Sequence, residues 1–535
     1  MKFWVQVVLL LFTSCQHPVF ADLAAKDPNP GLNFTIIETY FKPVKCFEFN
    51  FELAMTCAEG LNSALKLVPD GRELIGEAEM SARYELLKDY GPVKLAREIT
   101  RLQPATYQEA LQLRDRKLQA LEEGVKALIG KTPPFDYRAE IRGVAALVPT
   151  GTPESKIVLA ALDGQLKSRD AHAFLMTHQD FEEFQGSNDP GLIGVGVTLH
   201  PANRAYRFQR VIASGGGAQA GLKDRDLLLE IDGQKIGFDL SSEEVVKRLR
   251  GPEGSVVTLK IERAGQPLIF KVTRRPFRMK NIESRFLPAS ATGVVRIERF
   301  AATGDQNLSL CTEVDLQLHD LQEDGAKNFV LDLRDNPGGF IDQAICILSL
   351  FTGPDQVAVR AKAPGATSAE TVYRTSGERR YTGGLVVLIN EASASASELL
   401  AGAVQDLGAG WVVGKRSFGK GSLQDFNAFT EAPGEAVEAR TVQLFYQPNG
   451  RTNQGEGIFP DLAVDAAPGD DEWVPREFDL FPKALRLEKK TPEKWVTPRP
   501  QALQKLTACV QARLSSESGE DPQLARALTA LGCNY

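Results

Sequence analysis

Between about residues 293 and 465, short apolar runs that suit buried strands alternate with longer segments that have helical spacing. The predicted order is strand 293–297, helix 306–322, strand 329–333, helix 340–351, strand 385–389, helix 395–407 and strand 411–413. This alternation is typical of a parallel sheet covered by helices. Loops that follow parallel strands gather at one edge of such a sheet, and ligands bind there. Any functional site of this region is therefore predicted among the loops that follow its strands.

The rest of the chain differs in character from this α/β region, and its 535 residues are enough for three or four domains. The predicted segments are a signal peptide at 1–21, a helical N-terminal region at 22–155, a helical segment at 156–188, a β-rich module at 189–276, an α/β core at 277–465 and a tail with a short helical hairpin at 466–535. In the β-rich module, strands are predicted at 195–199, 227–231, 256–261 and 268–272, with one helix at 241–250. The predicted fold class is a multi-domain α+β protein.

The charge balance argues against one class of partner. The chain carries 62 Lys and Arg against 69 Asp and Glu, a formal net charge of −7. General nucleic-acid binders are usually basic, so no nucleic-acid partner is predicted. The apolar content of 43% and charged content of 24% are ordinary for a globular protein. Beyond the N-terminus, no stretch is long and apolar enough to predict a transmembrane segment.

The first 21 residues predict an export signal. Lys2 supplies a positive charge, residues 3–13 form an apolar stretch too short to span a bilayer, and residues 19–21 offer a signal-peptidase site. Residues 12–15 loosely match a bacterial lipoprotein box, so lipidation of Cys15 stays open, as does a buried N-terminal helix. The predicted location is the bacterial periplasm, with secretion or a lipid anchor at Cys15 as alternatives.

The cysteine count agrees with export, because an even number in an oxidising compartment predicts disulfides. Once Cys15 is removed or lipidated, the remaining cysteines are Cys46, Cys57, Cys311, Cys346, Cys509 and Cys533. Proximity in sequence favours a Cys46–Cys57 bridge. It also favours Cys509–Cys533, which would close a hairpin of two predicted helices near 501–515 and 521–531. For Cys311 and Cys346, in apolar helical segments, a bridge and two buried thiols are equally open. No cysteine or histidine cluster has zinc spacing, so no metal or other cofactor is predicted.

The first candidate loop is Asp335-Asn336-Pro337-Gly338-Gly339, which follows the predicted strand 329–333. Two adjacent glycines allow the backbone to turn its N–H groups outward at the start of a helix. Such N–H groups suit a developing negative charge. A plain tight turn is the simpler interpretation of this loop alone.

The second candidate loop is Glu391-Ala392-Ser393-Ala394-Ser395-Ala396-Ser397, which precedes a predicted helix. A serine at a strand-to-helix turn is exposed, and the first helical N–H groups beside it lack partners. A nucleophile with an oxyanion hole has these requirements, and small neighbours let a polymer approach closely. A Ser/Ala-rich helix cap is the alternative, and the choice among the three serines stays open at this point.

The third candidate loop is Ser417-Phe418-Gly419-Lys420-Gly421. A nucleophilic serine needs a base, and nothing marks any of the five histidines as catalytic. Desolvation can lower a lysine pKa by up to ~3–5 units, so Lys420 could accept the serine proton. A solvated loop lysine is the alternative. Residues 414–420 also match a P-loop pattern, but Gly421 stands where that motif needs Ser or Thr. The Gly-rich segment 215–220 is a weak match to a dinucleotide-binding motif and is predicted as a surface turn.

With these motifs in this order, the sequence resembles the carboxyl-terminal processing proteases, also called tail-specific proteases, over roughly residues 155–465. The resemblance rests on the segments 331–339, 390–398, 417–424 and 457–461. It implies that Ser395 is the nucleophile, Lys420 the general base and Gln424 the residue that orients Lys420. It also implies backbone oxyanion donors at Ala396 and at Gly338 or Gly339, and a core similar to the crotonase and Clp protease folds.

The same resemblance implies that the β-rich module is a PDZ domain. The segment Ile193-Gly194-Val195-Gly196 resembles its carboxylate-binding loop, where backbone N–H groups hold a peptide C-terminus. The expected function is an exported Ser-Lys endopeptidase that cleaves proteins near their C-termini, with a PDZ groove that binds them and controls access. The alternative is a catalytically silent PDZ adaptor. Protein or peptide C-termini are the predicted partners, and a dimer or larger assembly is left open.

Overall fold

The computed structural model describes residues 151–185, 192–201, 206–236, 242–278, 280–302, 308–363, 370–429, 434–465, 475–481, 499–513 and 521–533, together with short pieces between 45 and 148. The predicted export signal and most of the predicted helical region 22–155 lie outside the described residues. The chain divides into two compact units. One unit comprises Met1–Leu102, Asp115–Phe181 and Gln424–Arg440, and the other Gln103–Arg114, Glu182–Leu423 and Thr441–Tyr535.

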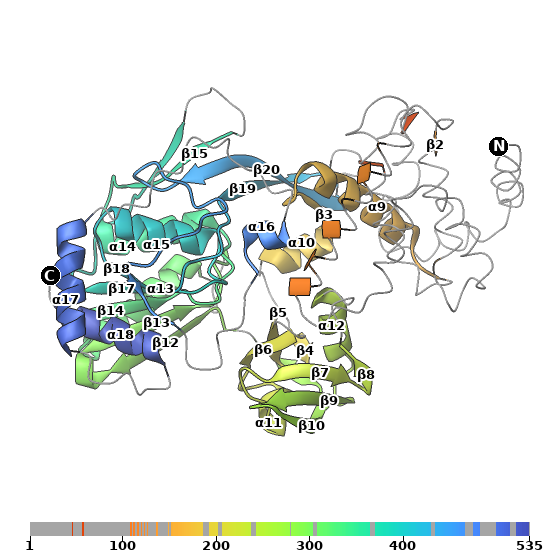
Figure 1. Cartoon of the computed structure of the whole chain (residues 1–535), viewed down its shortest axis with the longest axis horizontal. Helices are drawn as coiled ribbons and strands as arrows, with labels where there is room; N and C mark the ends of the chain where they lie inside the picture. Colours follow the sequence, from red (N-terminus) through yellow and green to blue (C-terminus); the bar gives the residue numbers. More distant parts are fainter. Residues whose placement is uncertain are drawn as a thin grey trace, which may run out of the picture. The chain divides into compact units, whose positions relative to one another are not determined.

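A six-stranded sheet forms the centre of the larger unit (Figure 1). Its strands, in spatial order, are β12 (Ile282–Leu287), β13 (Thr292–Ile297), β14 (Asn328–Asp332), β17 (Leu385–Ile389), β18 (Trp411–Gly414) and β21 (Leu462–Ala463). All neighbours are parallel except β12 and β13. Because β14, β17 and β18 are parallel, the three candidate loops that follow them leave the sheet at the same edge.

Helices cover both faces of this sheet, as the strand–helix alternation predicts (Figure 1). One face carries α13 (Leu310–Glu323), α14 (Ile341–Thr352) and α15 (Ala396–Asp406), and the other carries α17 (Pro500–Arg513) and α18 (Pro522–Leu531). Successive strand residues point to opposite faces. Phe329 and Leu331 therefore pack with the first group, and Val330 packs with the second. The first predicted helix starts four residues late, at Leu310, because Ser309 caps it by accepting from Thr312 N–H.

A second sheet was not apparent from the sequence pattern. Its strands are β16 (Thr371–Arg374), β15 (Val357–Lys362), β20 (Ala436–Tyr446), β19 (Ser422–Ala428) and β3 (Phe174–Thr177). In the larger unit, the end of β20 pairs with β15. In the smaller unit, the start of β20 pairs with β3, which follows α9 (Glu154–Arg169). These strands are half polar, and their partners are far away in sequence, so local periodicity does not identify them.

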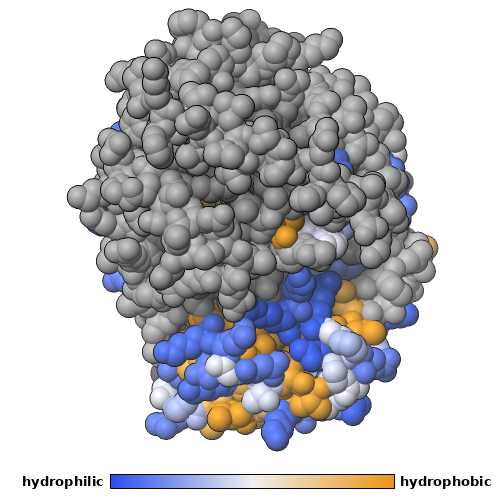
Figure 2. Space-filling view, turned by 90° about the vertical axis from the view of Figure 1, so that its right-hand side faces the viewer, coloured by the Kyte–Doolittle hydropathy of each residue, from blue (hydrophilic) through white to orange (hydrophobic). Residues whose placement is uncertain are grey.

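The β-rich module is an antiparallel sheet with its own apolar core. Its elements are β5 (Val197–Pro201), β6 (Tyr206–Val211), α11 (Gly216–Ala220), β7 (Leu227–Ile231), β8 (Gln234–Lys235), α12 (Ser242–Leu249), β9 (Val256–Arg263) and β10 (Gln266–Thr273). The main path runs β10-β9-β7-β6-β5, so β5 is an edge strand. The lower part of Figure 2 shows hydrophobic residues among hydrophilic ones on one face of this module.

Two predictions for this module are corrected by its glycines. The predicted strand 195–199 is interrupted: β4 (Leu192–Gly194) pairs with β11 (Arg275–Phe277), and β5 begins only at Val197. Gly196, with a φ of 78°, makes the break. A Cβ atom on Gly196 would lie 2.7 Å from the Cα atom of Gly215. Gly215 to Gly217 are buried at the start of α11, so the predicted surface turn is wrong. Close backbone contact requires glycine here.

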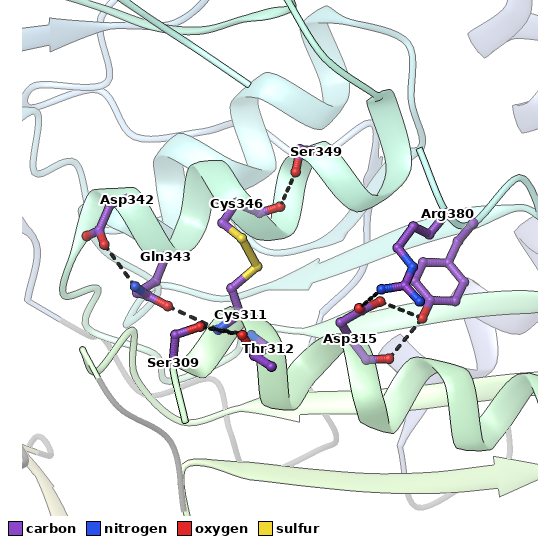
Figure 3. The surroundings of a disulfide bond; sticks show 10 residues. Ser309, Cys311, Thr312, Asp315, Asp342, Gln343, Cys346, Ser349 and Arg380 are labelled. Atoms are coloured by element: carbon purple, nitrogen blue, oxygen red, sulfur yellow. Dashed lines mark hydrogen bonds and ion pairs between the residues drawn. A yellow bond between two sulfur atoms is a disulfide. The ribbon is translucent and has the colours of Figure 1, made fainter. Parts of the chain in front are cut away.

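The described cysteines are bonded. The predicted Cys509–Cys533 bridge is confirmed, and it joins α17 to the end of α18. Cys311 and Cys346 also form a disulfide, which decides the question that the sequence left open (Figure 3). It links α13 to α14, whose first turn follows the Gly338-Gly339 loop. Cys57 is disulfide-bonded. The side chain of Cys46 lies outside the described residues, so its pairing with Cys57 stays a prediction.

Candidate active site

The three serines of the second loop have different environments. The hydroxyl of Ser393 donates to Leu333 O at 2.8 Å, and that of Ser397 donates to Asn336 O at 2.9 Å. Both side chains are fully buried, whereas Ser395 retains 9% exposure. Two serines thus hydrogen-bond to the backbone at Leu333 and Asn336, and Ser395 is the most exposed of the three.

Ser395 directly precedes α15 and has an unusual backbone conformation. Its φ of 56° lies in the left-handed region, which is uncommon for residues other than glycine. Such strain persists only where the surrounding structure holds it, and it clusters at functional sites. The backbone N–H of Ser395 donates to Glu398 Oε2 at 2.8 Å. The chain therefore turns sharply at Ser395 and enters the helix with Ala396.

Asn336 connects the first loop to the second. Its side chain is fully buried, donates from Nδ2 to Ile297 O and accepts at Oδ1 from Gly338 N–H, both at 2.9 Å. Its backbone carbonyl accepts from Ala394 N–H at 3.0 Å. A Cβ atom on Gly338 would lie 2.7 Å from Ser395 Cβ and 3.0 Å from the Ala396 nitrogen. Gly338 is therefore in direct contact with the turn that carries Ser395.

The backbone N–H groups of Gly338 and Gly339 differ in whether they already donate a hydrogen bond within the loop. Gly338 N–H is occupied by Asn336, and Gly338 O accepts from Phe300 N–H at 2.8 Å. The C=O and N–H of a trans peptide bond point in opposite directions. Gly339 N–H is therefore directed away from Phe300. Both glycines have positive φ, of 102° and 138°, and a Cβ atom on Gly339 would overlap the Phe300 carbonyl.

The backbone of the Lys420 loop is saturated with hydrogen bonds. Each N–H group of residues 417–421 donates a hydrogen bond; the acceptors, in chain order, are Ile458 O, Ser393 O, Glu398, Glu398 and Gln454. Each carbonyl of the same residues accepts one; the donors, in chain order, are Arg476, Glu477 N, Gly455 N, Asn453 and Phe445 N. Lys420 Nζ lies 3.5 Å from Ser422 O, and the side chain is half-buried. The loop thus carries the half-buried lysine side chain on a backbone whose N–H and C=O groups are all hydrogen-bonded.

Glu398 joins the serine loop to the lysine loop. Its Oε2 accepts from the backbone N–H groups of Ser395 and Lys420, each at 2.8 Å. Its Oε1 accepts from Ser417 Oγ at 2.5 Å and from Gly419 N–H at 2.7 Å. Burial raises the pKa of Glu398 to about 7, although these four donors favour the ionised form and oppose the rise. One buried carboxyl thus brings the backbones of Ser395 and Lys420 together.

Sequence reasoning gave Glu398 no role, although a local signal was present. Ser395 and Glu398 have the spacing of a capping box, S-x-x-E, just before an apolar helix. The long-range contacts to Ser417, Gly419 and Lys420 have no such signal. Gln424 lies on β19, and its predicted role toward Lys420 stays a prediction.

The fourth motif, residues 457–461, is hydrogen-bonded to the lysine loop and to the elements next to it. Ile458 and Ser417 exchange two hydrogen bonds: Ile458 N–H donates to Ser417 Oγ at 2.6 Å, and Ser417 N–H donates to Ile458 O at 3.0 Å. Asp461 accepts from Val412 N–H and from Gln405 Nε2, both at 2.9 Å. The motif therefore connects the lysine loop to β18 and to the end of α15.

A chain of charged groups connects the first loop to the β-rich module. Arg296 contacts Asp335 Oδ2 at 3.2 Å and Glu298 at 2.7 Å. Glu298 in turn pairs with Arg210, at the end of β6. Burial alone would raise the pKa of Asp335, but Arg296 and hydrogen bonds from Asn390 and Gln209 hold that pKa below its usual value. Residues of β6 are thus electrostatically coupled to the start of the glycine loop.

Neither a metal cluster nor a membrane helix is found in the described part of the chain. No group of three or more His, Cys, Asp or Glu side chains there could hold a metal ion. None of the helices among these residues has the length and apolarity to span a bilayer.

The chain matches two protein families. Peptidase family S41 matches residues 291–464, and the PDZ domain family matches residues 208–263. A carboxy-terminal-processing protease of Bartonella bacilliformis is 31% identical over 314 residues, 58% of this chain and 70% of that protein. A "Probable CtpA-like serine protease" of Staphylococcus aureus is 28% identical over 311 residues, 58% of this chain and 60% of that protein. The solved photosystem II D1 C-terminal processing protease aligns with a TM-score of 0.44 and 20% identity over 71% of this chain and 93% of that one. The chain therefore belongs to peptidase family S41, the serine-type peptidases that include the carboxy-terminal-processing proteases.

Proposed function

We propose that the protein is an exported endopeptidase that cleaves proteins near their C-termini with a Ser395–Lys420 dyad. The observation that carries this proposal is the shared carboxyl of Glu398, which holds the Ser395 and Lys420 backbones at one point. Ser395 Oγ attacks the scissile carbonyl while its proton passes to neutral Lys420 Nζ and then to the leaving amine. Water hydrolyses the acyl-enzyme, with Lys420 accepting the water proton and returning one to Ser395. Gln424 is proposed to orient Lys420.

The proposed oxyanion hole consists of two backbone N–H groups. Ala396 N–H is at the first turn of α15, where helical N–H groups lack intrahelical partners. Gly339 N–H is proposed as the second donor in preference to Gly338 N–H, because the latter donates to Asn336. Both would stabilise the negative charge that develops on the carbonyl oxygen.

Gly338→Ala should lower kcat by about 10²–10³-fold, the range for loss of an oxyanion-hole contribution. The added methyl would lie 2.7 Å from Ser395 Cβ and 2.8 Å from Ala394 O, at a φ of 102° that alanine rarely adopts. Steady-state kinetics on a chromogenic peptide measure the change. A matched control is Gly450→Ala, which has a similar positive φ of 89° but open space around its Cβ position. A Gly338→Ala enzyme with wild-type kcat would contradict the proposed geometry.

The PDZ module is proposed to bind substrate C-termini at its edge strand. A peptide would add to β5, and its carboxylate would meet the N–H groups of the Ile193–Gly196 loop. Arg250 is exposed at the end of α12 and lies next to this loop, since a Cβ atom on Gly194 would be 3.4 Å from Arg250 Cα. Its charge would favour a terminal carboxylate over an amide.

Control of access by the groove is also proposed. The path from β6 through Arg210, Glu298 and Arg296 to Asp335 supports it, because a peptide on the module could change how the glycine loop is held. The effect can be no larger than the differential affinity of the peptide for the two states.

The test uses a pair of substrates that differ only in a free or an amidated C-terminus. Wild-type protein should cleave the free acid better, and Ser395→Ala should cleave neither. Arg250→Glu should raise KM for the free acid about three- to tenfold, as one lost attraction and one new repulsion at an exposed site are each worth about 0.5 kcal/mol. The amide should be unaffected. If kcat of Arg250→Glu for the free acid also falls, peptide binding in the groove controls access to the active site. If saturating substrate restores full turnover in this variant, the groove only tethers the substrate. Binding without cleavage by wild-type protein would favour the adaptor.

We propose a PDZ domain at 189–276, a protease core at 277–465 with a crotonase-like or Clp-like fold, and an export signal at 1–21 that leads to the periplasm. The apolar stretch at 3–13 supports the export signal. The βαβ order of β13 to β18 supports the fold of the core.

A further inference from the structure

The Lys420 loop has contacts to residues outside the segment that matches the peptidase family. The match ends at residue 464, and α16 (Glu477–Leu480) follows it. Residues 475–481, which include α16, form a segment that we name the strap. Figure 1 shows α16 well separated from α17 and α18, although all three follow the last strand of the core. The strap therefore has a different location from the rest of the tail.

Two carbonyl groups of the Lys420 loop have their partners in the strap. The guanidinium of Arg476 donates from Nη2 to Ser417 O. The backbone N–H of Glu477 donates to Phe418 O at 3.3 Å. Ser417 is fully buried, so its carbonyl would lose its partner without gaining water if Arg476 were removed.

A relay of side chains reaches the residue after Lys420. Glu477 is fully buried, and its Oε1 accepts from Gln454 Nε2 at 3.1 Å. Gln454 Oε1 accepts from Gly421 N–H at 2.7 Å. The carboxyl oxygen of Glu477 accepts, so the NH₂ end of the Gln454 amide faces it. The oxygen of that amide must then face Gly421. Glu477 thus sets the orientation of the group that holds the end of the loop.

The third contact is apolar. The ring of Phe478 covers Gly455, where a Cβ atom would overlap the ring. Gly455 N–H donates to Gly419 O at 2.7 Å, so the ring fixes the segment that holds the glycine before Lys420. The strap therefore supports the loop at Ser417, Phe418, Gly419 and Gly421.

We propose that the strap positions the catalytic base, with Arg476 and Glu477 as positioning residues. This role rests on the proposed function, in which Lys420 accepts the Ser395 proton. Glu398 holds the N–H groups of Gly419 and Lys420, and the strap holds the carbonyls of Ser417 and Phe418. Misplacement of a reacting group by about 1 Å can cost about 10²-fold in rate. Loss of either positioning residue should therefore lower kcat by about 10- to 100-fold and leave KM within about twofold.

The experiment compares Arg476→Ala and Glu477→Ala with Arg499→Ala as a matched control. Arg499 likewise follows the family segment and donates to two backbone carbonyls, those of Gly408 and Gly410. These carbonyls precede β18 and are not part of the Lys420 loop. All three variants should lower the melting temperature, but only the two strap variants should lower kcat. The strap variants should also shift the apparent pKa of the kcat–pH profile, and Glu477→Gln, which keeps an acceptor, should restore most of kcat.

Wild-type kcat and an unchanged pH profile in Arg476→Ala and Glu477→Ala would overturn the role of the strap. Equal losses of kcat in the strap variants and in Arg499→Ala would also overturn it, since general destabilisation would then explain both. If the alanine variants do not fold, Arg476→Lys against Arg499→Lys carries the same comparison, with active sites counted by a serine-reactive fluorophosphonate. Failure of the proposed function has a separate signature, which is turnover by wild-type protein that Ser395→Ala retains.

Discussion

Lys420→Arg should be as inactive as Lys420→Ala, with kcat lowered by roughly 10²–10⁴-fold, the range for loss of a general base. Arginine keeps the positive charge and the length, but its guanidinium cannot be deprotonated in a protein, so it cannot accept the Ser395 proton. The loop itself should be preserved, because the backbone N–H groups of Gly419 and Lys420 donate to Glu398 and do not depend on the lysine side chain. The experiment therefore separates the chemistry of Lys420 from its structure.

The measurement is kcat on a chromogenic peptide between pH 5 and 10, with Lys415→Arg as the control. Lys415 is on the same loop region and pairs with Glu391 at 3.1 Å, an interaction that arginine can keep. Wild-type activity should rise with pH as neutral amine accumulates. Turnover near the wild-type value in Lys420→Arg would eliminate the Ser-Lys mechanism.

Glu398→Gln should lower kcat by about 10²-fold or more, and Glu398→Ala should be worse. The carboxyl accepts four hydrogen bonds, and glutamine offers only one oxygen, so two buried donors would lose their acceptor at about 1–3 kcal/mol each. The donors include the backbones of Ser395 and Lys420, so the loss falls on the two residues proposed to react. Glu313→Gln, at a buried glutamate in α13, is a control that should leave kcat unchanged.

The same carboxyl predicts opposite effects of pH on activity and on stability. The pKa of Glu398 is about 7 in the folded protein, whereas a solvent-exposed glutamate has a pKa of 4.5. As the pH rises through 7 the carboxylate forms and accepts all four donors, so activity should increase. A pKa that is raised on folding contributes stability that is complete below about 4.5 and lost as the pH rises through 7. Over that window the wild type should lose about 3 kcal/mol relative to Glu398→Gln.

Denaturant unfolding at several pH values, with both proteins in the Ser395→Ala background, measures this difference. Carboxyl ¹³C NMR of glutamate-labelled protein reports the pKa directly, because the Glu398 signal is missing in Glu398→Gln. Titration of that signal near pH 4.5 would contradict the predicted pH dependence of activity.

The α/β core and its three candidate loops could be predicted from the sequence. Strands such as β7 and β17 and helices such as α15 follow from apolar periodicity and end at glycines or caps, all of which are local signals. The motifs around Ser395 and Lys420 carried the family resemblance. Local signals also predicted the Cys509–Cys533 hairpin, because its two helices are consecutive.

The groups that hold these loops together are identified only in the folded protein. Glu398 meets Lys420, and Arg476 meets Ser417, across sequence separations that no periodicity encodes. The burial of Gly215 to Gly217 and the Cys311–Cys346 bridge depend in the same way on distant partners. Periodicity and capping report only on one element and its neighbours in sequence. A buried carboxyl, a carbonyl or a glycine acquires its role from the segment packed against it, and that segment is selected by the fold.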